Sequence, residues 1–151
     1  MERGFKTMSE LTEKRRRIDA LEREGMTAWK ERDDLVEAER KLKEALGEAR
    51  EMARVTAPLG QICLHLAVLY TDLNRFAEAE RLFQQAVSLQ ELIDPDDLFM
   101  VNLLDGYTAL LNKVGRPQEA ETLRTRATAV NENFMSKRVR ESRGKAGTPN
   151  T

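Results

Sequence analysis

Apolar and polar residues follow a helical period through most of the chain, and the pattern is clearest in residues 66–91. Two apolar stripes with intervals of three and four residues flank a short polar break at residues 72–75. A break of this length between two helical stripes predicts the turn of a helical hairpin. The first stripe consists of Leu66, Ala67 and Tyr70, and the second of Ala79, Leu82, Phe83, Ala86, Val87 and Leu89.

The same pattern occurs three times along the chain, with a spacing of 41 residues, as in Ala38, Ala79 and Ala120. A fixed period of this size in a helical pattern is typical of stacked repeats. The same spacing relates Ala45, Ala86 and Ala127; Leu21, Ile62 and Leu103; Trp29, Tyr70 and Leu111; and Glu37, Glu78 and Glu119.

Six helices are predicted from this pattern and from the residues that begin and end helices. We expect them at about 8–32, 34–53, 61–73, 76–92, 98–114 and from 117 to about 134 or 138. Thr7 and Glu10 have the spacing of a capping box at the first helix. Pro58 and Gly60 predict a linker at residues 56–60, and Asp94 and Pro95 have the order of a helix cap and first turn.

The middle repeat resembles a known family of helical repeats. Residues 63–70, with Cys63, Leu66, Ala67 and Tyr70, followed by Ala79, Phe83 and Ala86, resemble the tetratricopeptide repeat pattern. The longer period of 41 residues, with Leu-Ala-x-Leu-Tyr at 66–70 and Ala-Glu-x-Leu-Phe at 79–83, resembles the kinesin-light-chain-like branch. The resemblance covers about residues 18–134 and departs from the pattern at Pro117 and Arg124.

This resemblance implies an all-α fold, a right-handed α-α superhelix (solenoid) of three tetratricopeptide-like helical hairpins. We expect one repeat domain at 1–136, with repeats at about 18–58, 59–97 and 98–136. Residues 137–151 have no apolar periodicity, and we expect a disordered basic tail there. The tail has five Lys or Arg residues and one Glu, so it carries +4 and residues 1–136 carry −5 of the net −1.

Charge and composition indicate in which cell compartment the protein is located and which kinds of partner it does not attract. A net charge of −1 gives no general attraction to nucleic acid or to an anionic membrane. No run of 18 apolar residues occurs, and the first residues lack the apolar core of a secretory signal. A single cysteine, Cys63, excludes an internal disulfide and fits a reducing compartment. We therefore expect a cytoplasmic protein that does not enter a membrane.

Candidate catalytic and metal-binding groups are few. His65 is the single histidine, and Cys63 lies about 200° around the helix from it, so the two cannot form a thiolate–imidazole pair. Cys63 occupies the same repeat position as Leu104, which predicts a buried thiol. The acidic run at 94–97 lacks the alternating ligands of a calcium loop. We expect no metal, no cofactor and no enzymatic activity.

The resemblance also implies where a ligand binds, because the first helix of each pair lines the concave side of such a solenoid. The implied groove is polar and mixed in charge, with an apolar centre at Leu64 and Val68, which suits an extended peptide. Its residues are Arg23, Thr27, Lys30 and Glu31 in the first repeat, Gln61, Leu64, His65, Val68 and Asp72 in the second, and Asn102, Asp105, Ala109, Asn112 and Lys113 in the third.

Three functions are compatible with these features. A scaffold or adaptor that binds a protein or peptide segment in the groove is favoured by the repeat pattern. A self-assembling homo-oligomer that uses the groove or the terminal helices is the alternative. It is indicated by the long first helix and by the apolar residues of the last helix (Leu123, Val130, Phe134 and Val139). A nucleic-acid-associated factor would use Arg15, Arg16, Arg17 and the basic tail, but the acidic body opposes it. The basic cluster 14–17 is interpreted as a solvated helix face, because several glutamates lie beside it.

Overall fold

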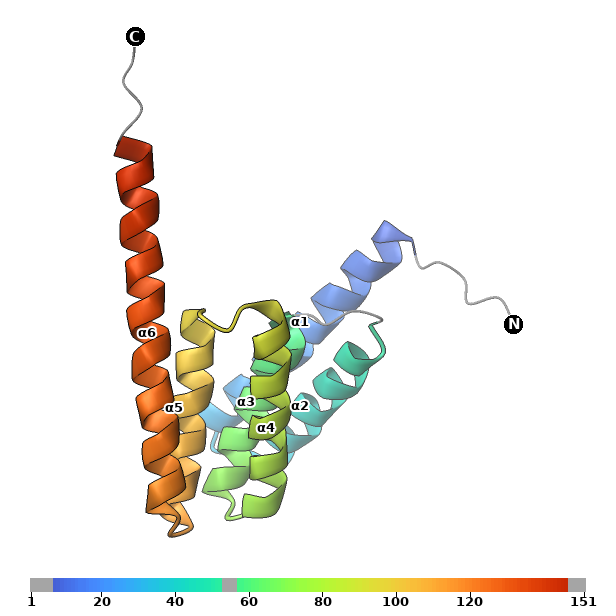
Figure 1. Cartoon of the computed structure of the whole chain (residues 1–151). Helices are drawn as coiled ribbons and strands as arrows, with labels where there is room; N and C mark the ends of the chain where they lie inside the picture. The colour runs from blue at the N-terminus through green and yellow to red at the C-terminus, as the bar shows by residue number, and fades with distance from the viewer. Residues whose placement is uncertain (1–6, 53–56, 147–151) are drawn as a thin grey trace, which may run out of the picture. The chain divides into compact units, whose positions relative to one another are not determined.

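The computed structural model describes residues 7–52 and 57–146, and within them all regular structure is helical. Three consecutive hairpins are formed, by α1 (Met8–Lys30) with α2 (Leu35–Arg50), α3 (Ala57–Asp72) with α4 (Phe76–Ile93), and α5 (Leu98–Lys113) with α6 (Pro117–Ala146) (Figure 1). The predicted all-α class and its six helices are confirmed. The chain divides into two compact units, 1–86 and 87–151, and we describe each by itself.

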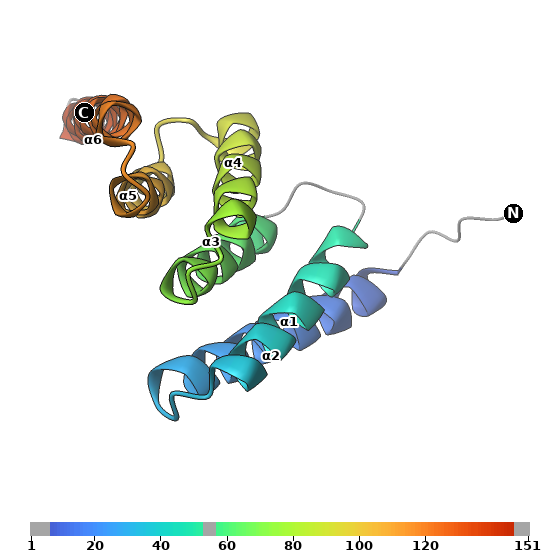
Figure 2. The same cartoon turned by 90° about the horizontal axis from the view of Figure 1, so that it is seen from below.

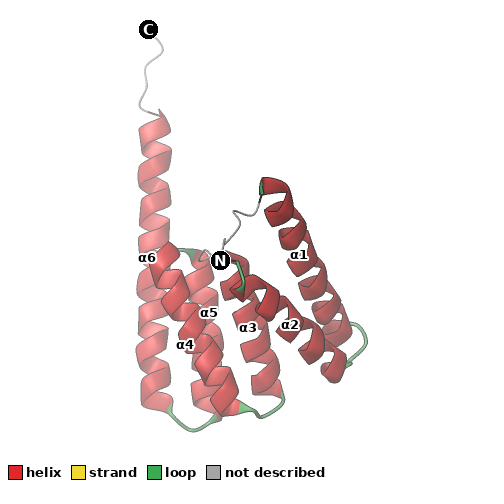
Figure 3. Ribbon diagram, turned by 90° about the vertical axis from the view of Figure 1, so that its right-hand side faces the viewer, coloured by secondary structure: helices red, strands yellow, loops and turns green. Residues whose placement is uncertain are grey.

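The turns inside the three hairpins share one backbone geometry. Asp33, Asn74 and Gly115 have φ angles of 53°, 59° and 80°, and they lie 41 residues apart. A left-handed residue just past a helix end is a common helix stop, and Gly, Asn and Asp adopt this conformation most readily. The next N–H then donates to a carbonyl of the preceding helix at 2.8 Å: Asp34 to Ala28, Arg75 to Tyr70, and Arg116 to Leu111. Figure 3 shows these short turns between the helices.

Most helix ends lie within three residues of their predicted positions. The capping box is confirmed, since the Thr7 N–H donates to Glu10 Oε2 at 2.9 Å and the Glu10 N–H donates to Thr7 Oγ1 at 3.2 Å. The linker predicted at 56–60 is shorter than expected. Helix α3 begins at Ala57, because Pro58 in the first turn needs no N–H partner; residue 56 lies outside the described residues.

The cap of α5 also differs from the prediction. Asp97, rather than Asp94, is the N-cap, and its Oδ1 accepts a hydrogen bond from the Phe99 N–H at 2.8 Å. Asp94 Oδ1 accepts one from the Asp96 N–H at 3.0 Å, so Asp94 and Pro95 form a separate turn before the helix. Both aspartates could cap a helix. The Asp94 side chain is used in the local turn, and Asp97 therefore caps α5.

Helix α6 is longer than predicted and continues to Ala146, well past the start of α5 in Figure 1. The expectation of disorder from residue 137 is therefore wrong for residues 137–146, and residues 147–151 lie outside the described part. The side chains of 137–146 are exposed, which explains why this stretch has no apolar period. Arg143 and Lys145 lie in its last turn, where positive charge stabilises a helix end.

Residues at equivalent repeat positions are buried in both units, which confirms the predicted register. The six alanines at 38, 79, 120, 45, 86 and 127 are at most 5% exposed. The 87–151 unit has a core of Met100, Leu104, Ala127 and Val130, with Val87, Val101 and Leu123 packed against it. Arg124 occupies the position of the buried Leu42 and Phe83, but it is exposed and pairs with Glu121 on the helix surface.

Helices α1 and α2 approach each other closely at Gly25, a buried residue in the second half of α1. A Cβ atom added there would lie 2.9 Å from Leu42 Cγ and 3.3 Å from the Ala38 carbonyl oxygen. Glycine normally weakens a helix interior, so its presence here is explained by the space it leaves for α2. Figure 2 shows α1 and α2 lying side by side along their length.

We expect Gly25→Ala to lower the free energy of unfolding by about 1–2 kcal/mol, because the overpacking against Leu42 exceeds the gain in helix propensity. Gly47→Ala is the matched control on α2, where an added Cβ meets no atom within 4 Å. It should raise the free energy of unfolding by about 0.5–1 kcal/mol. Urea denaturation measures both values. Equal stabilisation by the two substitutions would contradict the close approach at Gly25.

Candidate protein-binding surfaces

In the 1–86 unit, the predicted groove residues of α3 lie on one face of that helix. Gln61 and Asp72 are exposed, and Leu64, His65 and Val68 are partly exposed. The opposite face carries core residues such as Ile62 and Leu69, which are fully buried. On α1, Arg23, Lys30 and Glu31 are exposed and Thr27 is partly exposed. These positions are therefore accessible to a partner in this unit.

His65 is held by a residue that the sequence did not single out. Its Nδ1 lies 2.7 Å from Oε1 of Glu22 on α1, and the two side chains are 23% and 12% exposed. Both atoms are buried, and neither forms a hydrogen bond of accepted geometry with a residue that the structure describes. The contact is therefore a close approach of two polar groups. The pair links α1 to α3, and no spacing within one helix could have revealed it.

In the 87–151 unit, the predicted residues of α5 form an exposed stripe. It consists of Asn102, Asp105, Ala109, Asn112 and Lys113. The side chains of Asn102 and Asp105 form no hydrogen bond or ion pair with any residue that the structure describes. On the same helix, Met100, Leu103 and Leu104 face the core and are fully buried. Asn102 and Asp105 are thus polar groups available to a ligand.

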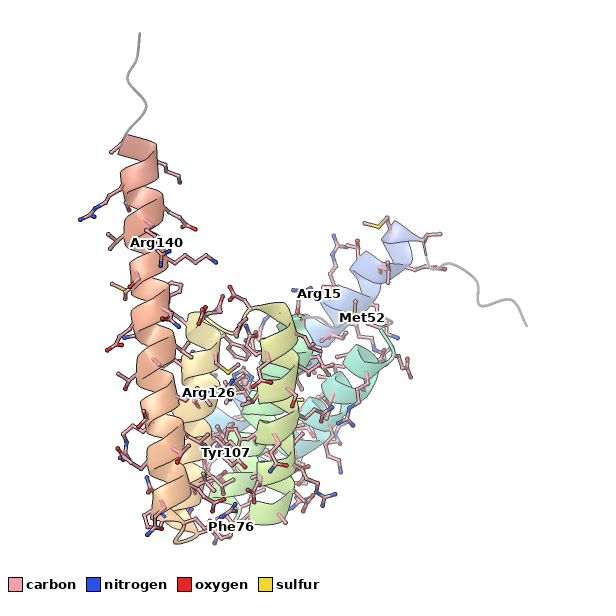
Figure 4. The ribbon with its side chains drawn as sticks, in the orientation of Figure 1. Arg15, Met52, Phe76, Tyr107, Arg126 and Arg140 are labelled. Atoms are coloured by element: carbon pink, nitrogen blue, oxygen red, sulfur yellow. The ribbon has the colours of Figure 1, made fainter. Side chains whose placement is uncertain are left out.

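Several charged side chains in the first half of α6 are paired instead. Arg116, just before α6, pairs with Glu119, and Arg124 pairs with Glu121. Arg126 Nη2 lies 2.6 Å from Oε1 of Glu91 on α4, and Figure 4 labels Arg126 on α6. These partners reduce what this surface offers to a ligand, in contrast to the stripe on α5.

The basic cluster 14–17 on α1 is also paired. Lys14 Nζ lies 2.8 Å from Glu51 Oε2, and the Arg17 guanidinium lies 3.4 Å from Glu48 Oε1. Arg15 and Arg16 lie 3.6 Å from Asp19 and Glu13, respectively. Salt-bridged residues on a solvated face are what the sequence interpretation expects for this cluster.

A polar network on the other side of the 1–86 unit joins α2, α3 and α4. The Tyr70 hydroxyl donates to Glu39 Oε1 at 3.2 Å, and Arg75 Nη1 donates to the same oxygen at 2.7 Å. Arg75 also donates two hydrogen bonds to Glu78 at 2.8 and 2.9 Å, and its guanidinium lies 4.2 Å from the Tyr70 ring centre. Burial, with the Glu39 carboxylate, raises the pKa of Tyr70 to about 12.

The single cysteine, a candidate reactive group, is buried and has a raised pKa. Cys63 is fully buried, as its repeat position predicts, and burial raises the pKa of its thiol to about 11. In residues 7–52 and 57–146, no group of three or more His, Cys, Asp or Glu side chains could hold a metal ion. No helix in the same ranges is long and apolar enough to cross a membrane.

Comparison with known families gives one match. Residues 60–133 match the model of the tetratricopeptide repeat family. This segment is therefore similar to tetratricopeptide repeats. It includes most of α3, all of α4 and α5, and the first half of α6. Such repeats generally mediate protein–protein interactions and are typically non-catalytic scaffolds. No curated protein matches the chain.

The raised pKa of Tyr70 gives a test of the network. In a Tyr107→Phe background, the phenolate absorbance of the native chain should titrate near pH 12. Because the folded state holds this proton more tightly than the unfolded state, whose pKa is about 10, stability should fall as the pH rises from about 10 to about 12. Glu39→Gln should lower the pKa of Tyr70, with the remaining shift due to burial. An unchanged pKa in that variant would exclude Glu39 as a cause.

Proposed function

We propose that this protein is a tetratricopeptide-like scaffold that binds a peptide or protein segment on the exposed faces of its inner helices, α1, α3 and α5. The proposal rests on one observation. Among the residues that the structure describes, Asn102 and Asp105 on α5 are exposed and form no hydrogen bond or ion pair, whereas Arg124 and Arg126 on α6 are ion-paired. Unpaired polar groups on a rigid helix can bind the backbone and side chains of a partner with little rearrangement.

The chemistry of these faces supports an extended segment. Short amide and carboxylate side chains on α5 can accept and donate hydrogen bonds to a peptide backbone. On α3, the partly exposed Leu64 and Val68 offer shallow apolar contacts one helical turn apart. Each unit offers its own part of the proposed surface, with α1 and α3 in the 1–86 unit and α5 in the 87–151 unit. His65 would contribute with its Nδ1 atom 2.7 Å from Glu22 Oε1.

Three finer assignments belong to this proposal. The left-handed turn residues recur every 41 residues, which supports a place in the longer-period, kinesin-light-chain-like branch. A non-catalytic role is supported by Cys63, whose thiol is buried and has a raised pKa. The free state of that single cysteine also supports a cytoplasmic location.

The test uses peptides selected by display on the native chain. The double variant Asn102→Ala/Asp105→Ala should bind these peptides about tenfold more weakly, because hydrogen bonds near the centre of an interface contribute most to affinity. Its melting temperature should not change, since both side chains are exposed. Isothermal titration calorimetry and thermal melting measure the two effects.

The matched control is Glu121→Ala/Arg124→Ala, which removes an exposed pair from α6 at no core position. Peptide affinity should be unchanged in this control. If the α6 variant loses binding and the α5 variant retains it, the partner binds the outer helices, and the inner-face proposal must be abandoned.

Self-assembly is the second candidate, favoured by the apolar residues on the far part of α6. Met135 and Val139 lie one turn apart on this helix and are 53% and 47% exposed. If they form an interface between two copies, the native chain should show twice its monomer mass by light scattering at high concentration. Met135→Gln/Val139→Gln should then be monomeric. A monomer mass for the native chain at every concentration would exclude this candidate.

A further inference from the structure

A hollow of about 340 Å³ lies in the 1–86 unit between α2 and α4, with α3 beneath it. It is separate from the residues of α1 and α3 in the proposed function. Charged side chains from α2 and α4 form the sides of the hollow, and apolar side chains form its floor. Its lining consists of Lys43, Leu46 and Arg50 from α2, Leu66 and Tyr70 from α3, and Glu78, Arg81, Leu82 and Gln85 from α4.

Positive charge predominates in this hollow. Lys43, Arg50 and Arg81 line it together with one carboxylate, Glu78. That carboxylate is already bound by two N–H groups of Arg75, which holds its pKa below the usual value. The lining cations therefore exceed the carboxylate that could neutralise them.

The cations themselves are weakly engaged. Arg81 is exposed and forms no hydrogen bond or ion pair with a residue that the structure describes. Lys43 Nζ lies 3.9 Å from Glu39 Oε1, and that oxygen already accepts hydrogen bonds from Tyr70 and Arg75. Arg50 donates to the neutral amide oxygen of Gln85 at 3.0 Å. All three can turn toward an anion without breaking a strong ion pair.

The next repeat shows that the repeat architecture does not require these cations. At a spacing of 41 residues, Arg50 and Gln85 correspond to Glu91 and Arg126, which are in contact at 2.6 Å in the 87–151 unit. The contact between helices is thus kept with opposite charges that neutralise each other. Lys43 and Arg81 correspond to Gln84 and Thr122, which are uncharged. The excess of positive charge in the hollow is therefore not repeated at the equivalent positions of the next repeat.

The floor favours a peptide over a nucleic acid. Leu46, Leu66 and Leu82 make it apolar, and because they are largely buried it offers only a shallow apolar contact. Single-stranded nucleic acids are usually bound by stacking bases on exposed aromatic rings. Tyr70 cannot provide such a platform, because the Arg75 guanidinium already lies over its ring.

We propose that this hollow binds an acidic segment of a partner protein, with a carboxylate between Lys43 and Arg81 and an apolar side chain against the floor. Charge-assisted hydrogen bonds to Lys and Arg are stronger than neutral ones, so the two cations should contribute much of the affinity. The site would let the protein contact a partner on α2 and α4 while the inner helices hold another segment.

The probe is an acetylated and amidated peptide of Leu-Phe flanked by two glutamates on each side, and glutamines replace the glutamates in a control peptide. Titration of the ¹⁵N-labelled full chain should shift the amide signals of the hollow on α2 and α4. Lys43→Gln/Arg81→Gln should weaken binding of the acidic peptide by about tenfold. The double variant should melt as the native chain does, because exposed charges contribute little to stability.

Arg32→Gln is the matched control, since it removes one exposed positive charge from the same unit away from the hollow. Retained affinity in this control and in Asn102→Ala/Asp105→Ala would support the site and separate it from the inner-face proposal. The inference is overturned if the acidic peptide binds no better than its glutamine control, or if the Lys43/Arg81 variant binds equally well. It is also overturned if a single-stranded oligonucleotide shifts the same signals more strongly than the peptide.

Discussion

The close approach of the two helices in each hairpin is the constraint on which the other features depend. Ala38, Ala79 and Ala120 are at most 1% exposed, and larger side chains at these positions would separate the helices. Gly25 permits the same closeness in the first hairpin. The left-handed turn every 41 residues returns the chain directly onto the helix it has just formed. Small residues and short turns together set the register of each helix pair.

This register decides which side chains remain available for binding. On α5, the core takes Met100, Leu103 and Leu104, so Asn102 and Asp105 are left on the exposed face. The outer helices use their charges in pairs within and between helices, as at Arg126 and Glu91. In the hollow between α2 and α4, this pairing is incomplete. Arg50 contacts the neutral Gln85 instead of a carboxylate, so positive charge remains there.

The comparison between repeats also separates structural from functional residues. Leu42 and Phe83 are buried at one repeat position, but Arg124 at the third is exposed and pairs with Glu121. No described side chain buries that face of α6, and a charged residue is therefore tolerated there. Glu22 and His65 differ in another way, since their contact joins α1 to α3 through two polar groups.

The sequence by itself determined the helical class, the hairpins and the buried faces, because apolar periodicity and turn residues are local signals that repeat. The resemblance to tetratricopeptide repeats also implied an inner face with Asn102 and Asp105, and both residues are exposed. The contacts of Glu22 with His65, and of Glu39 with Tyr70 and Arg75, were decided by the tertiary structure. They join residues more than thirty positions apart, and no local pattern records such a distance. The length of α6 beyond residue 136 was missed for the opposite reason, because its exposed residues have no apolar stripe to mark the helix.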